Sequence, residues 1–216
     1  MTTTAVLTAQ RVALSRAHRR ILDDVDLTVL DGEHVAVIGP SGSGKTTLLT
    51  LLAGIERPDT GEVLLDDRPL TRPGPEVALV LQGYGLLGLL TASENIEVAM
   101  RAAGRTPAEA IQAGEETLRS VGLDGFGSRL VDDLSGGQQQ RVAVARALAL
   151  APRVLLADEP TAEQDPAHRE LVVERLLHPD NASAVVIATH DPEIAARCDR
   201  VIELHQGRVL EAPAAG

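Results

Sequence analysis

The sequence is poor in the features that mark secreted and membrane-spanning proteins. Cys198 is the only cysteine, which excludes a disulfide framework and fits a reducing compartment. Residues 1–4 carry neither the basic segment nor the apolar core of a signal peptide. The longest run without a charged side chain, residues 77–93, is interrupted by glycines and is too short to cross a bilayer. We therefore expect a soluble protein that reaches a membrane only through a partner.

Positive charge is also scarce. Lys and Arg total 20 against 31 Asp and Glu, which gives a formal net charge of −11. This balance argues against a general nucleic-acid binder, although a phosphate site needs only local positive potential. With 44% hydrophobic residues, the 216-residue chain is long enough for one α/β domain, with or without a sizeable insertion. We expect no nucleic-acid partner.

One glycine-rich stretch carries a specific motif. An apolar run at residues 35–38 leads into Gly-x-x-x-x-Gly-Lys-Thr and then into an apolar segment of helical length, residues 46–53. This order predicts a phosphate-binding loop, because glycines let backbone N–H groups converge on an anion at a helix N-terminus. Lys45 is expected to reach the β- and γ-phosphates, and the Thr46 hydroxyl to ligate Mg²⁺. The alternative is a glycine-rich turn with an incidental lysine. The candidate nucleotide-binding residues are Gly39, Pro40, Ser41, Gly42, Ser43, Gly44, Lys45, Thr46 and Thr47.

A second candidate lies where the apolar run at residues 154–157 ends in two carboxylates, Asp158 and Glu159. Side chains alternate along a strand, so these two start on different faces. Asp158 suits a Mg²⁺ shell, since hard cations prefer oxygen ligands. Glu159 suits a place beside the γ-phosphate, where a carboxylate orients and polarises an attacking water. By itself, such an acidic strand end also fits a solvated turn.

Two further segments are less specific. Ser135, Gly136, Gly137 and Gln138 open a helical run and leave its N-terminus accessible to an anion, but an ordinary capped helix has the same residues. His190 follows the apolar run at residues 184–188, where a histidine is either structural or catalytic.

The hydrophobic pattern predicts an α/β fold with a mainly parallel sheet. Helical stretches near residues 165–177 and 192–198 alternate with the β-like runs 154–157, 184–188 and 201–204. Upstream we expect strands at residues 5–14, 25–30, 62–66 and 77–81, with a basic stretch at residues 16–20 between the first two. From Ser93 to about Leu150 the chain is predicted to be mostly helical, as an inserted subdomain.

These motifs together resemble the nucleotide-binding subunit of an ATP-binding cassette (ABC) transporter. The resemblance covers nearly the whole chain and rests above all on the signature Leu-Ser-Gly-Gly-Gln at residues 134–138. In order, the matching elements are Walker A at residues 39–46, the Q-loop at Gln82, the signature, Walker B at residues 155–158 with the catalytic Glu159, the D-loop at Asp165 and the switch histidine His190.

The resemblance implies a phosphate-loop core with an N-terminal antiparallel β part. Residues 1–216 would then form one ABC ATPase domain, with its core at residues 1–82 and 151–216 and a helical subdomain at about residues 83–150. It implies ATP and Mg²⁺ as cofactors, with Thr46, Gln82 and Asp158 as metal ligands. His190 would hold the γ-phosphate and the attacking water, and Gln82 would link the site to the helical subdomain.

The resemblance also implies partners. Two ATPase subunits, most simply a homodimer, would sandwich two ATP molecules head to tail. Ser135, Gly136, Gly137, Gln138 and Asp165 would then act on the nucleotide of the other subunit. Residues 82–90 would contact an integral membrane permease, placing the protein on the cytoplasmic, inner face of the cell membrane. Within the family, the chain looks most like the lipoprotein-releasing, macrolide-export and cell-division ATPases.

The chain departs from the family pattern at two places. The family usually has an aromatic residue before Walker A that stacks on adenine, but this chain has one Tyr, one Phe and no Trp. The corresponding position falls near Arg16, with His18 close by; either these side chains stack on the base or they are simply solvated. In the D-loop, Gln164 replaces the usual leucine, which bears on contacts across the dimer.

The resemblance implies an ATP-hydrolysing subunit that powers a separate permease through ATP-driven dimerisation. An alternative is an ATP-gated clamp that signals to a membrane or cell-wall partner without transport. A soluble ABC ATPase that acts on nucleic acid or ribosomes fits the acidic charge less well.

Overall fold

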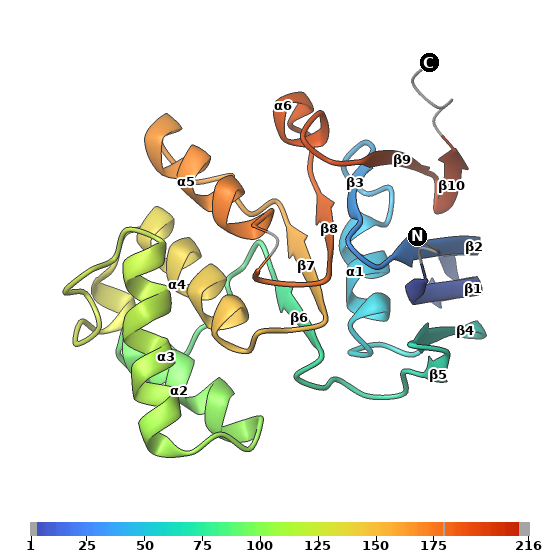
Figure 1. Cartoon of the computed structure of the whole chain (residues 1–216). Helices are drawn as coiled ribbons and strands as arrows, with labels where there is room; N and C mark the ends of the chain where they lie inside the picture. Colours follow the sequence, from blue (N-terminus) through green and yellow to red (C-terminus); the bar gives the residue numbers. More distant parts are fainter. Residues whose placement is uncertain (1–3, 179, 212–216) are drawn as a thin grey trace.

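The computed structural model describes residues 4–178 and 180–211, which form two β-sheets and a group of helices (Figure 1). The first sheet has four strands in the order β2-β1-β4-β5 and is antiparallel throughout. Its strands are β1 (Ala5–Arg16), β2 (Arg19–Leu30), β4 (Thr60–Leu65) and β5 (Arg68–Pro69). The predicted N-terminal antiparallel part is thereby confirmed.

The second sheet has six strands in the order β10-β9-β3-β8-β7-β6. All neighbouring strands are parallel except β9 and β10, which confirms the prediction of a mainly parallel sheet. Its strands are β3 (His34–Ile38), β6 (Val77–Val80), β7 (Val154–Asp158), β8 (Ala184–Ala188), β9 (Arg200–His205) and β10 (Arg208–Glu211).

The helices cover the two faces of this second sheet. Side-chain alternation sends Leu156 and Val186 into a core with α1 and the first sheet, and sends Leu155 and Val185 into a core with the other helices. Figure 1 shows α1 between the two sheets and α2 to α5 on the opposite side. The helices are α1 (Lys45–Leu52), α2 (Ala92–Ala102), α3 (Pro107–Ser120), the short 3₁₀ helix η1 (Val131–Asp133), α4 (Gly136–Ala149), α5 (Pro166–Leu176) and α6 (Pro192–Ala195).

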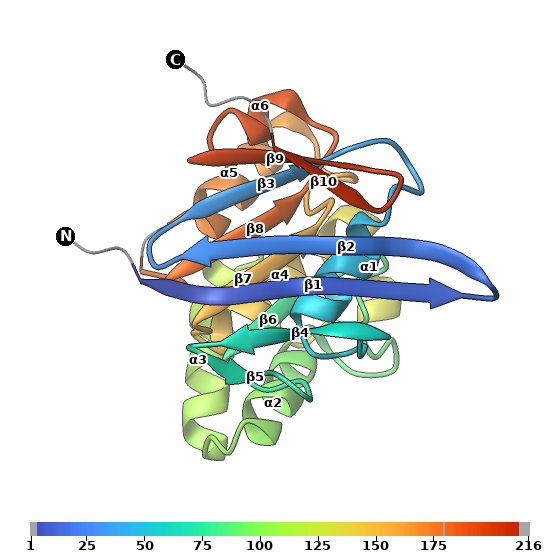
Figure 2. The same ribbon diagram turned by 90° about the vertical axis from the view of Figure 1, so that its right-hand side faces the viewer.

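Hairpin boundaries differ from the sequence prediction. The basic stretch at residues 16–20 is not a linker, because β2 begins at Arg19 and only Ala17 and His18 form the turn. Both turn residues have positive φ, 46° and 64°, as a two-residue hairpin turn of this twist requires. Figure 2 shows the resulting β1–β2 hairpin as a long ribbon along one side of the molecule.

The same turn geometry explains two strands that the sequence analysis missed. Strands β9 and β10 are joined by Gln206 and Gly207, and β4 and β5 by Asp66 and Asp67, all with positive φ. The Gln-Gly pair after an apolar run was a usable hairpin signal. Among residues 4–178 and 180–211, no helix has the length and apolar character needed to cross a membrane. The expectation about residues 1–4 lies mostly outside the described part of the chain.

Candidate functional site

Several of the candidate residues lie at one edge of the second sheet, because four neighbouring parallel strands end there. Strand β3 leads into the phosphate loop, β8 into Thr189 and His190, β7 into Asp158 and Glu159, and β6 toward Gln82. The carboxyl ends of parallel strands form the usual ligand-binding edge of an open α/β sheet. The fold therefore brings together segments that are more than a hundred residues apart in sequence.

The phosphate loop lies between β3 and α1 and is closed around its own lysine. Lys45 Nζ donates to the carbonyl oxygens of Gly39 at 2.8 Å and Pro40 at 3.2 Å. Gly39 has a φ of 148°, and a Cβ there would collide with the carbonyl oxygen of Leu204, so no other residue fits. Gly44, the N-cap of α1, has no side chain to occupy the helix N-terminus. This backbone is suited to an anion.

One buried atom of the loop supports this interpretation. Ser43 is 4% exposed, and its Oγ has no hydrogen-bond partner among the described residues. A buried hydroxyl without a partner is costly, and the site therefore favours a polar ligand such as a phosphate oxygen.

Thr46 and Asp158 form the second part of the site. Thr46 Oγ1 donates to Asp158 Oδ2 at 2.6 Å. Asp158 is buried, and this burial raises the pKa of its carboxyl group, with the neighbouring Glu159 adding to the rise while the Thr46 hydrogen bond and Lys45 oppose it. A hydroxyl and a carboxylate are the hard oxygen donors that Mg²⁺ prefers.

The described residues contain no cluster of three or more His, Cys, Asp or Glu side chains placed to hold a metal ion. A Mg²⁺ ion commonly uses only one or two protein ligands and takes the rest from substrate phosphates and water. The Thr46–Asp158 pair beside the phosphate loop therefore fits such an ion.

Glu159 and His190 form the third part of the site. His190 Nδ1 lies 2.9 Å from Glu159 Oε1, and Thr189 Oγ1 lies 3.5 Å from Glu159 Oε2. The Glu159 side chain is 14% exposed and the His190 side chain 76% exposed, so Glu159 is largely buried whereas His190 faces solvent. The contacts with His190 and Thr189 orient the Glu159 carboxylate beside the phosphate loop, as a general base requires.

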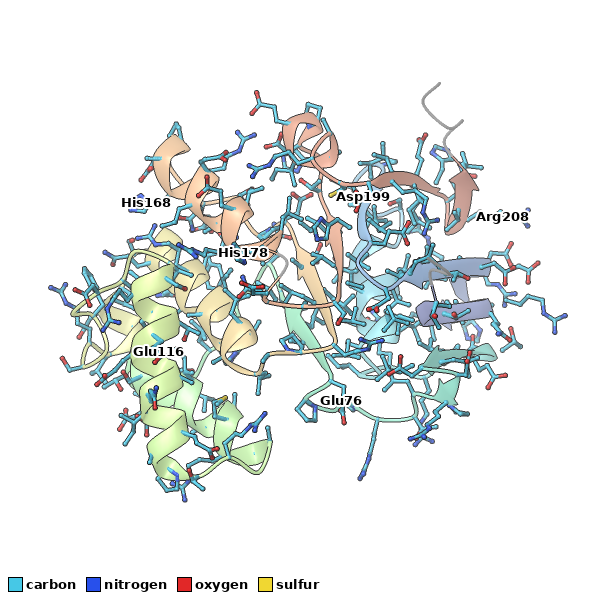
Figure 3. All side chains as sticks on the ribbon, in the orientation of Figure 1. Glu76, Glu116, His168, His178, Asp199 and Arg208 are labelled. Atoms are coloured by element: carbon cyan, nitrogen blue, oxygen red, sulfur yellow. The ribbon has the colours of Figure 1, made fainter. Side chains whose placement is uncertain are left out.

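The other candidates do not join this group within one chain. Gln82 is exposed, and no hydrogen bond among the described residues connects it to Thr46 or Asp158. Asp165 instead caps α5: it accepts from the backbone N–H groups of Ala167 and His168 and lies 2.6 Å from His168 Nδ1. Figure 3 shows His168 on α5, away from the sheet. These hydrogen bonds, with the backbone bond to His168 foremost, lower the pKa of Asp165.

The signature residues lie on the far side of the sheet from α1. Ser135 is the N-cap of α4, and it forms a capping box with Gln138: Ser135 Oγ accepts from Gln138 N–H, and Gln138 Oε1 accepts from Ser135 N–H. Helices α1 and α4 belong to the cores on opposite faces of the sheet. The signature is thus a capped helix start, and it does not reach its own phosphate loop.

Arg16 also has a partner within the chain. At the hairpin tip its guanidinium forms an ion pair with Glu56, and Glu56 accepts a second hydrogen bond from Thr50 Oγ1 in α1 at 3.1 Å. His18, in the same turn, is exposed.

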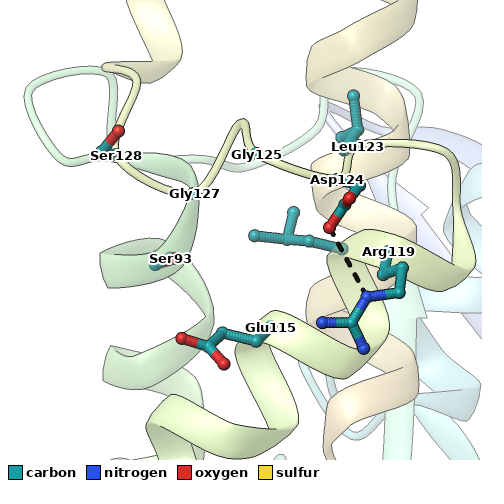
Figure 4. A pocket seen from close by; sticks show the side chains of 9 residues that line it. Ser93, Glu115, Arg119, Leu123, Asp124, Gly125, Gly127 and Ser128 are labelled. Carbon is teal, nitrogen blue, oxygen red and sulfur yellow. Dashed lines mark ion pairs between the residues drawn. The ribbon is translucent and has the colours of Figure 1, made fainter.

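A cavity of about 440 Å³ lies elsewhere, between α2, α3 and the loop after α3 (Figure 4). Ser93, Glu115 and Ser128 line it together with the ion pair of Arg119 and Asp124, whose charged atoms are 3.5 Å apart. None of the predicted site residues contributes to its wall.

Sequence reasoning missed two residues that contact Glu159. Thr189 reaches its carboxylate, and Gln140 Nε2 donates to its backbone carbonyl oxygen at 2.9 Å. Both are almost completely buried, Thr189 at 0% and Gln140 at 1% exposure. A buried polar residue within an apolar pattern was the available signal.

Comparison with known proteins agrees with this geometry. A family model described as ABC transporter matches residues 22–162. The lipoprotein-releasing system ATP-binding protein LolD of Anaeromyxobacter dehalogenans is 47% identical over 203 residues, which are 88% of this chain and 84% of that protein. The Fe(3+) ions import ATP-binding protein FbpC of Agrobacterium fabrum is 41% identical over 199 residues, which are 89% of this chain but only 56% of that protein.

Solved structures agree as well. A dimeric ATP-binding cassette in a post-hydrolysis state, bound to ADP and Pi, has a TM-score of 0.88 and 32% identity to this chain, with 97% of this chain and 99% of that chain covered. The family match spans more than half of the chain and includes the phosphate loop, the signature and the acidic end of β7. The chain therefore belongs to the ABC transporter family, as one of its ATP-binding, ATP-hydrolysing subunits.

Proposed function

We propose that this subunit hydrolyses ATP as a head-to-tail homodimer and thereby drives a separate membrane permease from the cytoplasmic face. The observation that carries the proposal is the pair of side-chain contacts beside the phosphate loop, Thr46–Asp158 and Glu159–His190. The first pair suits a metal ion and the second a nucleophilic water. Together they form the parts that phosphoryl transfer to water requires.

The substrate phosphates would be held by the backbone N–H groups of the loop, by Lys45 and by Ser43. Lys45 is held by two carbonyl oxygens and would exchange them for phosphate oxygens without leaving the loop. Thr46 and Asp158, and by family resemblance Gln82, would hold Mg²⁺. When bound there, the ion supplies positive charge that stabilises the negative charge developing on the phosphates.

Glu159 would act as the general base on the attacking water. Its contacts to His190 and Thr189 leave the carboxylate with a fixed direction, which lowers the entropy cost of placing the water. His190 is exposed enough to contact a nucleotide while it holds Glu159.

The second half of each site would come from the partner subunit. Ser135, Gly136, Gly137 and Gln138 lie at an accessible helix N-terminus on the far face of the sheet, so they can reach only another chain's nucleotide. Asp165 would take part from the neighbouring loop. The dimeric state of the related cassette that is bound to ADP and Pi supports this arrangement.

The permease would dock on residues 82–90. Leu87 and Leu89 are 54% and 87% exposed, which is unusual for leucine and suits an apolar partner. The loop is firmly held beneath them: Asn95 accepts from Leu87 N–H at 2.7 Å, and Arg146 donates to the carbonyl oxygens of Tyr84 and Gly85. A rigid loop transmits motion better than a free one.

The transported substrate is not specified by this chain alone. Relatives of similar identity include a lipoprotein-releasing protein and an iron importer. The 47% identity to LolD supports the lipoprotein-releasing group. Reconstitution in vesicles tests transport: ATP hydrolysis without movement of any substrate would favour the ATP-gated clamp instead.

The direct test of the chemistry is Glu159→Gln, which keeps the shape of the side chain and removes the base. Turnover should fall by roughly 10²–10⁴-fold, the range for loss of a general base. ATP binding should persist, and ATP-bound dimers should accumulate in gel filtration because uncleaved ATP holds them together. Glu116→Gln, on the exposed surface of α3, is the matched control and should hydrolyse ATP at the native rate. Near-native hydrolysis by Glu159→Gln would refute the proposed role.

A further inference from the structure

Gln164 occupies the centre of a small polar network between α4 and the segment that follows β7. Its Nε2 donates to the carbonyl oxygen of Gly137 at 2.8 Å and to Gln140 Oε1 at 3.0 Å. Its Oε1 accepts from Arg141 Nη1 at 2.8 Å. A single side chain therefore makes three hydrogen bonds to the first two turns of the signature helix.

The Gln140 amide has three partners, Gln164 among them, that all require the same orientation. The backbone N–H of Glu163 faces one end of that amide at 3.4 Å and can only donate, so this end is the oxygen. Gln164 Nε2 donates to the same oxygen more closely. The nitrogen of Gln140 is thereby directed to the carbonyl oxygen of Glu159, 2.9 Å away. Gln140 is buried, so it has no water to compensate for a wrong orientation.

Glu159 needs this support because its backbone is strained. Its φ is +46°, in the left-handed region that a glutamate rarely adopts. Its N–H donates to the carbonyl oxygen of Ala188 at 2.9 Å, and its carbonyl accepts from Gln140. Both sides of the residue are therefore held, and such backbone strain persists only where the surroundings fix it.

We propose that Gln164 is a positioning residue for ATP hydrolysis. It acts through the Gln140 amide to keep the Glu159 backbone, and hence its carboxylate, in place beside His190. The inference rests on the proposed role of Glu159 as the base. The leucine that the family usually has at this position can form none of these hydrogen bonds, so this chain uses a different support.

The same network connects the signature with the segment from Asp158 to Gln164 within one subunit. A Cβ on Gly137 would lie 2.6 Å from the carbonyl oxygen of Glu163, so the two backbones are in close contact. A shift of the signature on the partner's nucleotide would therefore be passed by Gln164 and Gln140 to the Glu159 of the same chain.

Two substitutions separate positioning from stability. Gln164→Leu removes every hydrogen bond of the side chain. Gln164→Glu keeps an acceptor for Arg141 but has no N–H for Gln140 or Gly137. We expect kcat to fall by about three- to tenfold in both variants, with the KM for ATP within about twofold of native. The Tm should fall in both variants, because Gln164→Leu leaves the buried Arg141 without this acceptor and Gln164→Glu places a carboxylate oxygen against the Gly137 carbonyl oxygen and Gln140 Oε1. The fall should be smaller in Gln164→Glu, which keeps a charge-assisted bond to Arg141.

Gln112→Glu makes the same chemical change on the exposed surface of α3, where the amide donates to Glu116, and serves as the control at native kcat. The inference is overturned if Gln164→Glu hydrolyses ATP at the native rate, or if the loss of kcat follows the loss of Tm, large in Gln164→Leu and small in Gln164→Glu. Glu159→Gln is measured in parallel. Loss of turnover there, with native rates in both Gln164 variants, would refute this inference alone, whereas a native rate in Glu159→Gln would refute the proposed base itself.

Discussion

At the scale of single residues, Arg16 lies near the position where the family resemblance implies an aromatic side chain that stacks on the base. Its guanidinium is bound to Glu56, which accepts a hydrogen bond from Thr50 in α1, so contacts within the chain account for the position of this side chain. No aromatic side chain lies nearby in the sequence. We therefore expect the phosphates to supply most of the binding energy.

Substitution of Arg16 tests this expectation. Stacking of a base on an aromatic side chain contributes about 1–3 kcal/mol, and about 1.4 kcal/mol corresponds to a tenfold change in affinity. Arg16→Tyr should tighten ATP by about tenfold, whereas Arg16→Ala should change it by less than about threefold. The native protein should discriminate poorly between ATP and GTP. Titration of fluorescent ATP and GTP analogues measures these affinities for the native protein, Arg16→Tyr and Arg16→Ala. A tenfold loss in Arg16→Ala or His18→Ala would show that these side chains do stack.

Part of the arrangement of the candidate site could be predicted from the sequence. Thr46 and Asp158 were both expected near a metal, and they are hydrogen-bonded to each other. The contacts of Gln140 and Gln164 could not be predicted, because they depend on how α4 packs beside the end of β7. No sequence spacing predicts such a contact between two glutamines.

At the scale of elements, three helices begin in the same way. Helices α2, α3 and α4 each open with a capping box, at Thr91, Thr106 and Ser135. The cap satisfies N–H groups that the helix itself cannot bond. Ser135 can therefore act both as a helix cap and as a nucleotide ligand. Comparing its substitution with that of the Thr106 cap separates the two roles.

Ser135→Ala and Thr106→Ala remove equivalent caps from α4 and α3. Each should lower the free energy of unfolding by about 1 kcal/mol, the usual cost of losing a threonine or serine cap. Only Ser135→Ala should also lower ATP turnover, because in the proposed dimer only Ser135 would contact a nucleotide. Urea unfolding and steady-state hydrolysis measure the two effects. An equal loss of turnover in both variants would mean that the signature serine acts through helix stability alone.

Strands and helices were largely predictable, but the β1–β2 hairpin was not. The apolar runs that became β3, β7 and β8 were found because buried parallel strands are continuously hydrophobic. The Ala17–His18 turn has neither glycine nor asparagine, so its composition did not predict the positive φ values of both residues. These values let β2 begin at Arg19. Tertiary pairing with β1 overrode the weak local signal.

At the scale of the whole molecule, the sheet separates the two halves of the proposed site. The phosphate loop and α1 belong to one core, and the signature helix α4 belongs to the other, on the opposite face (Figure 1). No sequence pattern within one chain reveals that a site is shared between chains. The family resemblance supplied this idea, and the single-chain geometry agrees with it because the signature does not reach its own phosphate loop.

Complementation between two inactive variants tests the shared site most directly. Lys45→Ala disables the phosphate loop, and Ser135→Arg places a bulky cation where the partner's γ-phosphate would dock. Each variant alone should be inactive. In an equal mixture about half of the dimers are mixed, and each mixed dimer has one site in which both halves are intact, so hydrolysis should recover to at most about a quarter of the native rate. A mixture that hydrolyses ATP no faster than the separate variants would contradict the head-to-tail dimer.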